Sequence, residues 1–443
     1  MEPHYCQRGD KMDSIWTKTA RLPRFAPLKN DLQTDVLIIG GGIAGLLCAY
    51  LLAEAGVDYA LVEAKRICSG VTKDTTAKVT SQHGLIYHKL IREFGPQKAA
   101  LYYRANQEAL ERYRELCRGI DCGFEEQDAF VYSTRSRGKI LRELAALKQL
   151  KCPADFQPAL PLPFPIAGAL VFRRQAQLHP LRFAAAIARG LHIYEETKVQ
   201  ELMPGRATTG GGNITANKII IATHFPILNK HGGYFLKLYQ HRSYVLALKG
   251  APVPGGMIID EDKKGLSFRS WGEQLLLGGG SHRTGKRGGG WRELEAFARQ
   301  HYPSAQITAR WATQDCMTLD GVPYIGRYAR STPDLYVAAG FNKWGMTSAM
   351  AAALALTRMV QGKATPYASL FDPARTMLRP QLLANAAEST AGLLTPTVPR
   401  CPHLGCALKY NPAERSWDCP CHGSRFGEDG SLLDNPATDD KGM

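Results

Sequence analysis

The chain has 443 residues, of which 44% are hydrophobic and 21% charged, as in a soluble globular protein of two or three domains. Its net charge of +15 predicts a basic surface, either spread along the chain or gathered into a patch for an acidic partner such as an electron carrier. No basic motif is interleaved with aromatic residues, so we expect no nucleic-acid binding.

Residues 1–30 are predicted to form an N-terminal arm. The arm carries scattered charges and lacks the apolar run of a signal peptide, so we expect a cytoplasmic protein. Most of the eleven cysteines follow no shared pattern, but the last four lie close together near the C-terminus. That clustering indicates metal chemistry rather than the disulfide framework of a secreted protein.

A glycine-rich turn follows an apolar β-strand at residues 36–39. Gly40, Gly42 and Gly45 have the spacing G-x-G-x-x-G, and an apolar helix runs from there to residue 54. In a dinucleotide site the first glycine permits the turn, the second lets the backbone approach a pyrophosphate, and the third lets the helix pack on the strand. A turn without a ligand is the alternative. A membrane helix over 36–53 is a further one, and three consecutive glycines argue against it.

The start of this helix and the next strand supply further binding groups. The backbone amides of Ile43 and Ala44 lie at the helix N-terminus, where unpaired N–H groups bind phosphate. The second strand, residues 59–62, ends at Glu63, which is placed to bind a ribose hydroxyl. Together these features predict a dinucleotide cofactor.

A loop of small hydroxylated residues at 68–80 contains Thr75 and Thr76, which are suited to lie along a dinucleotide. With this loop the chain resembles the D-amino-acid-oxidase-like family of FAD oxidoreductases, which includes glycine and sarcosine oxidases. The resemblance implies an α/β fold with a Rossmann-type FAD part at 31–85, 176–225 and 313–365. It also implies an inserted substrate part at 86–175 and 226–312, with an antiparallel sheet over 226–312. The whole oxidoreductase domain would span 31–365.

The same resemblance implies contacts from later segments. The backbone of Val199 would face adenine, and Ala222 ends the second FAD strand. A glycine ordinarily follows the threonine at 223 in this family, whereas this chain has His224. Gly340, Gly345 and Met346 lie where a strand meets a helix running to residue 360, whose N-terminus would sit under the flavin pyrimidine ring. The chain has no second dinucleotide fingerprint, so we expect direct reduction of the flavin rather than reduction by NAD(P)H.

Candidate catalytic residues come from the predicted substrate sheet and the flavin helix. Arg242, Arg269 and Arg283 are candidate anchors for a substrate carboxylate, although each is also compatible with an ordinary surface arginine. Lys343 and His282 are further candidates near the flavin.

After a helix and linker at 366–395, residues 396–443 carry a second motif. Cys401-x-His403 is followed by Cys419-x-x-His422, with Cys406 and Cys421 as an extra cysteine in each loop. The pattern resembles Rieske [2Fe–2S] proteins, which implies that Cys401 and Cys419 bind one iron and His403 and His422 the other. Structural zinc is the rival interpretation, but zinc loops usually separate their ligands by two to four residues.

The Rieske resemblance also implies a small all-β subdomain. Cys406 and Cys421 match a pair that forms a disulfide in relatives, although a cytoplasmic location argues against a stable disulfide. So short a segment buries little core, so we expect it to rest on the flavoprotein and to gain folding energy from the cluster.

The two motifs together resemble bacterial FAD oxidoreductases with a C-terminal Rieske domain. We expect an enzyme that oxidises a small amine or amino acid at FAD and passes electrons through the cluster to an acceptor. The alternative is an electron-transfer module reduced by a partner protein.

Overall fold

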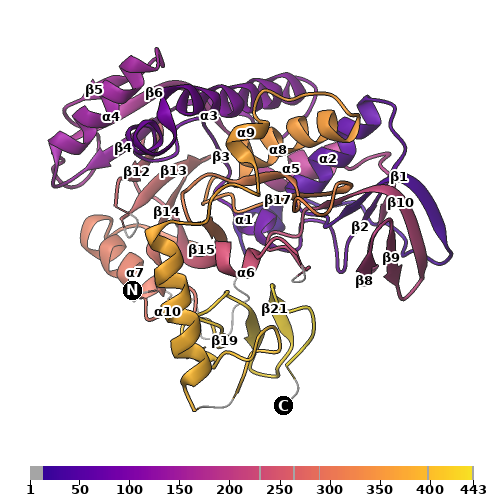
Figure 1. Ribbon diagram of the computed structural model, residues 1–443. Coiled ribbons are helices and arrows are strands. Elements are labelled where there is room, and N and C mark those ends of the chain that lie inside the picture. The colour runs from indigo at the N-terminus through magenta and orange to yellow at the C-terminus, as the bar shows by residue number, and fades with distance from the viewer. Residues whose placement is uncertain (1–12, 229–230, 263–264, 289, 397–398, 442–443) are drawn as a thin grey trace.

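The computed structural model describes residues 13–228, 231–262, 265–288, 290–396 and 399–441. Two large sheets with helices packed on them form the main body, and residues 399–441 form a C-terminal subdomain beneath it, coloured yellow in Figure 1. Among the described residues, none of the helices combines the length and the apolar character that a membrane crossing requires.

The first sheet has eight strands. These are β1 (Leu32–Ile39), β2 (Tyr59–Val62), β7 (Ile193–Tyr194), β8 (Val199–Met203), β9 (Arg206–Thr209), β10 (Gly212–Ile221), β16 (Tyr324–Arg327) and β17 (Leu335–Ala339). Their order is β16-β17-β10-β1-β2-β7, with β9 beside β10 and β8 beside β9. The central pairings from β7 to β17 are all parallel. Parallel strands are covered on both faces, and the apolar run at residues 36–39 is buried as that arrangement requires.

Helices α2 (Ile43–Glu54) and α8 (Gly345–Val360) pack on this sheet, and α5 (Pro180–Ile187) lies beside α2. α2 contacts both α5 and α8. Most residues of α2 and α8 are buried, and the many alanines of α8 allow close approach between helices. The predicted Rossmann-type α/β architecture is confirmed.

The second sheet has nine strands. These are β3 (Lys78–Val79), β4 (Glu125–Ser133), β5 (Asp155–Gln157), β6 (Gly168–Gln177), β11 (Leu238–Lys249), β12 (Met257–Asp260), β13 (Ser267–Trp271), β14 (Gln274–Arg283) and β15 (Gln306–Thr318). Their order is β15-β11-β14-β13-β12-β4-β6-β3, with β5 beside β6. All pairings are antiparallel except that of β12 with β4, where the later strands join those from earlier in the chain. β6 and β15 continue across the boundaries predicted at 175/176 and 312/313.

The remaining helices of the main body cover the second sheet and the junction between the sheets. α3 (Tyr87–Cys117) bends at Gly95, whose φ is +81°, immediately before Pro96. α4 (Arg137–Gln149), α6 (Tyr234–Lys237), α7 (Gly290–His301) and a short 3₁₀ helix, η1 (Val71–Asp74), complete this part.

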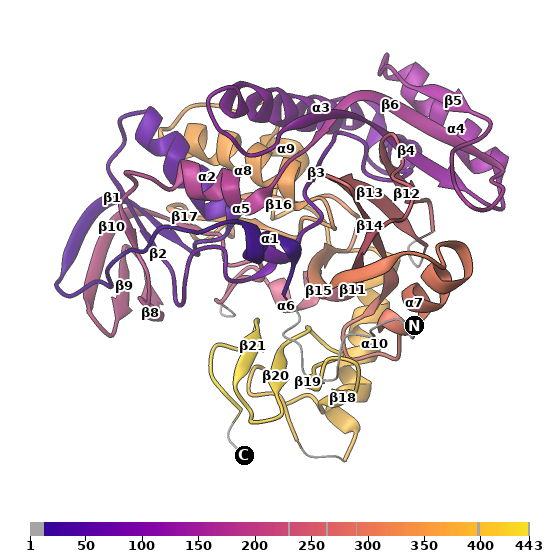
Figure 2. The same ribbon diagram turned by 180° about the vertical axis from the view of Figure 1, so that it is seen from behind.

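The first described helix, α1 (Ile15–Thr19), lies in the core rather than on the surface. The side chain of Trp16 is fully buried, and its indole N–H donates to the carbonyl of Thr75 at 2.7 Å. Its ring packs edge-on against Trp271 of the second sheet, with centroids 5.0 Å apart. Figure 2 shows α1 between the two sheets, so this part of the predicted arm helps to join them.

The C-terminal subdomain contains four short strands in sequential order: β18 (Lys409–Asn411), β19 (Ser416–Asp418), β20 (Arg425–Gly427) and β21 (Leu432–Asp434). All three pairings are antiparallel, which confirms a small all-β subdomain. α9 (Ala368–Phe371) and α10 (Pro380–Leu394) lead into it, and α10 lies alongside it in Figure 1. Four cysteines dominate its core, which is small without a metal cluster.

Candidate active site and cluster site

The three glycines of the β1–α2 turn have different surroundings. Gly40 has φ +111°, and a Cβ there would lie 2.7 Å from the carbonyl oxygen of Ala222. A Cβ at Gly45 would lie 1.9 Å from the carbonyl oxygen of Gly40, so helix and strand meet at backbone distance. Gly42 has φ −74°, and a Cβ there would have Thr72 Oγ1, at 3.6 Å, as its nearest neighbour. Two glycines therefore serve packing, whereas the third leaves backbone open to a ligand.

This turn opens into a central cavity of about 1300 Å³. The volume exceeds the usual range of roughly 300–1,000 Å³ for small-molecule sites, so the cavity is large enough for a dinucleotide. Most predicted cofactor residues line it: Gly40, Gly42, Ile43, Ala44, Glu63, Thr75, Thr76, Val199, Ala222, Gly345 and Met346. Gly45 and Gly340 do not line the cavity. A Cβ at Gly340 would lie 2.3 Å from Thr318 Cγ2, so this glycine also serves packing.

The carboxylate of Glu63 is fixed at the end of β2. One oxygen accepts from the N–H of Gly41 at 2.7 Å and the other from the N–H of Lys65 at 2.8 Å. Burial raises the pKa of Glu63, while these two backbone bonds lower it. The side chain thus reaches the cavity wall already oriented, and its contact with a ribose stays a prediction.

The N-terminus of α8 meets the cavity through a strained turn. Asn342 and Lys343 have φ values of +51° and +73°, which are uncommon for residues other than glycine. The amide of Asn342 holds the turn, because its Oδ1 accepts from the N–H of Thr318 at 2.8 Å. Strain of this kind persists where the surrounding structure enforces it, often at functional sites.

The turn places Lys343 in a polar group supplied by three neighbouring strands. Its Nζ hydrogen-bonds Ser243 of β11 at 3.2 Å and also Ser281 of β14. Asp315 of β15 interacts with Lys343 and hydrogen-bonds Ser243, and its side chain also lines the cavity. Burial raises the pKa of Asp315, and the charge of Lys343 lowers it. Lys343 and Asp315 on the cavity wall thus both interact with the side chain of Ser243.

The other catalytic candidates do not line the described cavity wall. Arg269 is fully buried and donates to the carbonyls of Thr76 and Leu178, the latter at 3.1 Å. His282 is stacked on Tyr244, with ring centroids 5.7 Å apart. Both side chains are engaged in internal packing, which corrects the expectation that they contact substrate or flavin.

Arg242 belongs to a buried ion-pair network between β11 and the C-terminal subdomain. Its Nε lies 3.0 Å from a carboxylate oxygen of Glu414, and Asp434 lies 3.7 Å from Nη1. Arg425 also pairs with Glu414 and Asp434, at 2.8 Å each, and with Asp418 at 3.0 Å. The expectation that Arg242 anchors a substrate is corrected, because these acidic side chains occupy its guanidinium.

The four predicted cluster ligands converge from two loops of the C-terminal subdomain. The thiols of Cys401 and Cys419 hydrogen-bond each other. The rings of His403 and His422 lie edge to face, with centroids 5.0 Å apart. The two loops thus supply one pair of sulfur ligands and one pair of imidazoles, which is the ligand set of a Rieske centre.

The chemistry of these groups fits a [2Fe–2S] cluster. The hydrogen bond from Cys419 lowers the pKa of Cys401 to about 7, and the hydroxyl of Ser424 contributes to the lowering. Burial lowers the pKa of His403 to about 4 and that of His422 to about 3, so both rings are neutral. The Nδ1 atom of His422 is buried with no hydrogen-bond partner in the described structure, a position that a metal satisfies. Thiolates and neutral imidazoles are the forms that bind iron.

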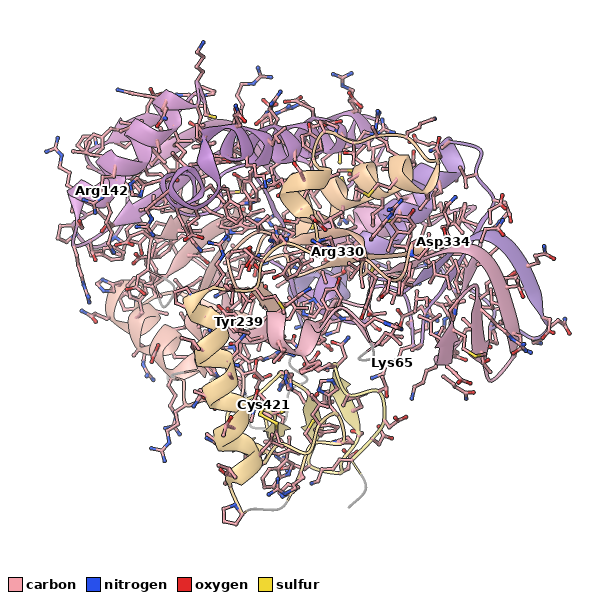
Figure 3. The ribbon with its side chains drawn as sticks, viewed as in Figure 1. Lys65, Arg142, Tyr239, Arg330, Asp334 and Cys421 are labelled. Atoms are coloured by element: carbon pink, nitrogen blue, oxygen red, sulfur yellow. A yellow bond between two sulfur atoms is a disulfide. The ribbon has the colours of Figure 1, made fainter. Side chains whose placement is uncertain are left out.

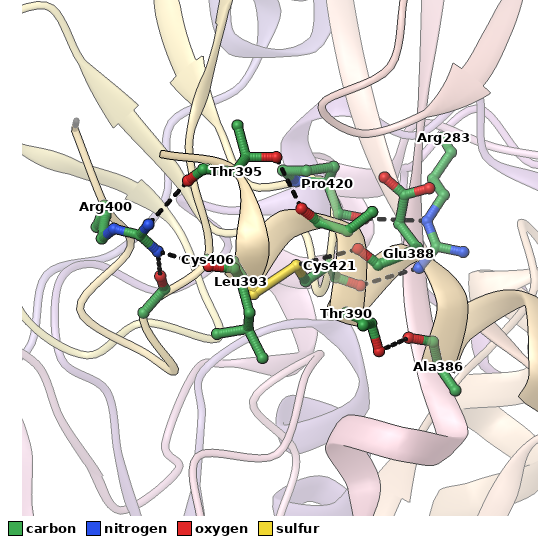
Figure 4. The surroundings of a disulfide bond; sticks show 12 residues. Arg283, Ala386, Glu388, Thr390, Leu393, Thr395, Arg400, Cys406, Pro420 and Cys421 are labelled. Carbon is green, nitrogen blue, oxygen red and sulfur yellow. Dashed lines mark hydrogen bonds between the residues drawn. A yellow bond between two sulfur atoms is a disulfide. The ribbon is translucent and has the colours of Figure 1, made fainter. Parts of the chain in front are cut away.

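Cys406 and Cys421 form a disulfide that ties the two ligand loops together (Figure 4). α10 packs directly on it, since a Cβ at Gly392 would lie 2.7 Å from Cys421 Sγ. Arg400 closes the junction by donating to the carbonyls of Gly405 at 2.7 Å and Thr395 at 2.8 Å. The sulfur atoms of Cys406, Cys419 and Cys421 lie close together. Because Cys406 and Cys421 form the disulfide, Cys419 is available to bind iron.

Side chains of three strands hold the second ligand loop by its backbone. Arg283 of β14 donates to the carbonyls of Pro420 and Cys421, each at 3.0 Å, as Figure 4 shows. Gln240 of β11 donates to the carbonyl of His422 at 3.1 Å, and Gln314 of β15 to that of Gly423 at 2.9 Å. Four consecutive carbonyls of residues 420–423 are thus occupied. Arg283 therefore positions the loop, which corrects the expectation that it binds a substrate carboxylate.

The C-terminal subdomain also forms part of the wall of the central cavity, through Leu432–Asn435, Ala437 and Thr438. Lys65 donates to the carbonyl of Leu432 at 3.0 Å, and Figure 3 shows Lys65 directly above this subdomain. The amide of Asn435 donates to the carbonyl of Phe225 at 3.0 Å. The subdomain that holds the cluster ligands and the cavity that fits the dinucleotide therefore share a wall.

Comparison with known proteins identifies both parts of the chain. Residues 35–359 match the model of the family described as FAD dependent oxidoreductase (DAO), and residues 384–441 match the Rieske [2Fe-2S] domain. The chain belongs to the FAD-dependent oxidoreductase family and carries a C-terminal Rieske domain. It binds FAD in the first part and a [2Fe–2S] cluster in the second.

Individual relatives share this organisation in whole or in part. "Putative Rieske 2Fe-2S iron-sulfur protein YhfW" of Bacillus subtilis is 35% identical over 96% of both chains. Gamma-glutamylputrescine oxidoreductase of Escherichia coli is 25% identical over 77% of this chain and 87% of its own. The crystal structure of glycine oxidase from Geobacillus kaustophilus superposes with a TM-score of 0.63 and 22% identity, covering 78% of this chain and all of that one. The similarity to the glycine oxidase structure shows the fold alone.

Sequence patterns did not reveal several residues of the site. Asp315, Ser243 and Ser281 carry no motif and meet only when their strands pair. Alternation along β11 is the one available signal, because it places Ser243 on the same face as His241 and Tyr239, which also line the cavity.

Proposed function

We propose that the protein oxidises the C–N bond of a small amine or amino acid at FAD and passes the electrons through the [2Fe–2S] cluster to an acceptor. The observation that carries the proposal is the shared wall: residues 432–435, 437 and 438 of the C-terminal subdomain help to enclose the cavity that we assign to the flavin. This shared wall supports electron transfer from the flavin to the cluster.

Relatives support an amine or amino acid as the substrate class. Gamma-glutamylputrescine oxidoreductase is named for an amine, and glycine oxidase for an amino acid. The polar group in the cavity of this chain has matching chemistry, because Lys343 offers a cation to a carboxylate and Asp315 offers a carboxylate to an ammonium group.

FAD, when bound, takes a hydride equivalent from the carbon next to nitrogen. The chain's own residues orient the substrate and manage its proton. We assign Lys343 to anchor an anionic substrate group, held in place by Ser243 and Ser281. We assign Asp315 to accept the proton that a substrate ammonium must lose before oxidation; burial raises its pKa and makes it a better base.

An anaerobic screen tests this proposal. The oxidised protein is mixed with simple amines, amino acids and N-methyl amino acids, and flavin bleaching is followed. We expect at least one class to bleach the flavin. Lys343→Met should raise the half-saturating concentration of substrates with a carboxylate by about tenfold or more and leave neutral amines unaffected.

The competing function is an electron-transfer module reduced by a partner protein. If no small molecule bleaches the flavin and reduced carrier proteins do, that function replaces the one proposed. The net charge of +15 supports an acidic protein as the electron acceptor in either case. We propose that the reaction takes place in the cytoplasm.

A further inference from the structure

His224 adopts a conformation that histidine seldom takes. It follows β10 with a φ of +65°, in the left-handed region, which is strained for a residue with a Cβ. Glycine would have no such cost. This uncommon conformation at the cavity wall directs attention to the contacts of the His224 side chain.

The imidazole lies between the central cavity and the C-terminal subdomain. His224 lines the cavity, and its Nε2 is 3.1 Å from Oε1 of Gln240. Gln240 is buried, and its amide nitrogen donates to the carbonyls of His422 at 3.1 Å and Asn435 at 2.8 Å. Two carbonyl acceptors fix the orientation of the glutamine amide, so its oxygen must accept from Nε2–H of His224.

This chain of hydrogen bonds is rigid as well as short. A Cβ at Gly423 would lie 2.6 Å from Cβ of Gln240, so the glutamine packs directly on the backbone of the ligand loop. On the other side, Asn435 donates to the carbonyl of Phe225, next to His224. Two hydrogen bonds thus separate a side chain on the cavity wall from the backbone of a cluster ligand.

We propose that His224 and Gln240 are positioning residues that couple the flavin site electronically to the cluster. This inference rests on the proposed function, in which reduced flavin gives up its electrons to the cluster. With both groups bound, the reduced flavin would supply two electrons one at a time. Each would reduce the cluster and then pass to an external one-electron acceptor, and the flavin proton would be released to solvent. The histidine and glutamine supply the fixed contact between the two centres.

Two substitutions of His224 and one control distinguish the proposed role from a purely structural role of this residue. His224→Gly removes the imidazole and also the backbone strain, so it should not lower the thermal midpoint. His224→Asn tolerates the same backbone conformation with a side chain too short to reach Gln240. Lys286→Gln is the matched control, since it breaks a 2.6 Å ion pair with Glu388 of α10 outside the cavity wall and the ligand loops.

The test uses the full-length holoprotein with the flavin reduced by light under anaerobic conditions, so no substrate is needed. The rate at which the cluster becomes reduced is followed optically, and the cluster is checked by EPR. We expect at least a tenfold slower transfer in His224→Gly and His224→Asn, with unchanged FAD content, EPR spectrum and thermal midpoint. Lys286→Gln should transfer electrons at the wild-type rate.

A wild-type rate in both histidine variants would overturn the inference while leaving the proposed function intact. So would a slow rate that appears equally in Lys286→Gln, because a loosened interface would then explain it. If light-reduced flavin in the unaltered protein does not reduce the cluster at all, the inference and the proposed electron route both fail.

Discussion

Replacing Gly42 with leucine separates flavin binding from folding. The backbone φ of −74° accepts any residue, and the new Cβ would meet no protein atom closer than Thr72 Oγ1 at 3.6 Å. The side chain therefore projects into the cavity, where the pyrophosphate approaches the backbone. We expect FAD to bind at least about 100-fold more weakly, a loss of about 2.8 kcal/mol.

The assay compares FAD content, cluster EPR signal and thermal midpoint of the purified protein. Gly42→Leu should lose flavin and keep the iron signal, because the ligand loops are in a different part of the chain. Gly45→Ala is the control for damaged folding, since its Cβ would lie 1.9 Å from the carbonyl oxygen of Gly40 and must displace backbone. Full FAD occupancy in a well-folded Gly42→Leu protein would refute this account of the turn.

Three further predictions concern buried charges and the cluster. Glu414→Ala leaves the buried Arg242 and Arg425 without their shared carboxylate, so we expect a destabilisation of roughly 3–5 kcal/mol. The cluster signal should then be lost at a lower temperature. An unchanged thermal midpoint would argue against a stabilising role of this ion-pair network. Burial raises the pKa of Glu143 from 4.5 to about 7, so the folded state keeps this proton to higher pH than the unfolded chain. The free energy of unfolding should therefore fall by up to roughly 3 kcal/mol as the pH rises from 4.5 to about 7. The thermal midpoint of Glu143→Gln should fall less steeply with pH than that of the unaltered protein. Equal slopes of thermal midpoint against pH would contradict the assignment. Ser424→Ala should lower the cluster reduction potential by removing a hydroxyl beside Cys401, and Phe426→Tyr should raise it by adding one; electrochemistry that finds neither shift excludes these hydroxyl effects.

Local patterns were sufficient to predict much of the fold. The β1–α2 turn and the two ligand loops each lie within a short stretch of chain, where residue type and spacing specify the backbone. The parallel pairing of β12 with β4 was not predicted, because it joins segments more than 120 residues apart.

The arginine assignments failed for the same reason of distance along the chain. Arg242 and Glu414 are 172 residues apart, and Arg283 meets the carbonyl of Pro420 across 137 residues. A buried arginine whose partner lies far away in the sequence has the same local sequence pattern as an arginine that binds a substrate. The departure at His224 was visible in the sequence, but its partner Gln240 became evident only when the two sheets and the C-terminal subdomain were in place.

The direction of electron flow is tested most directly by a single anaerobic turnover of the unaltered protein beside His403→Ala, which loses an iron ligand. The account predicts that an amine or amino-acid substrate bleaches the flavin equally well in both proteins. Reoxidation by a one-electron acceptor should then be fast in the unaltered protein and slow sharply in the variant. If bleaching fails in His403→Ala while FAD stays bound, electrons enter through the cluster and the proposed direction is reversed; if neither half-reaction changes, the cluster has a structural role.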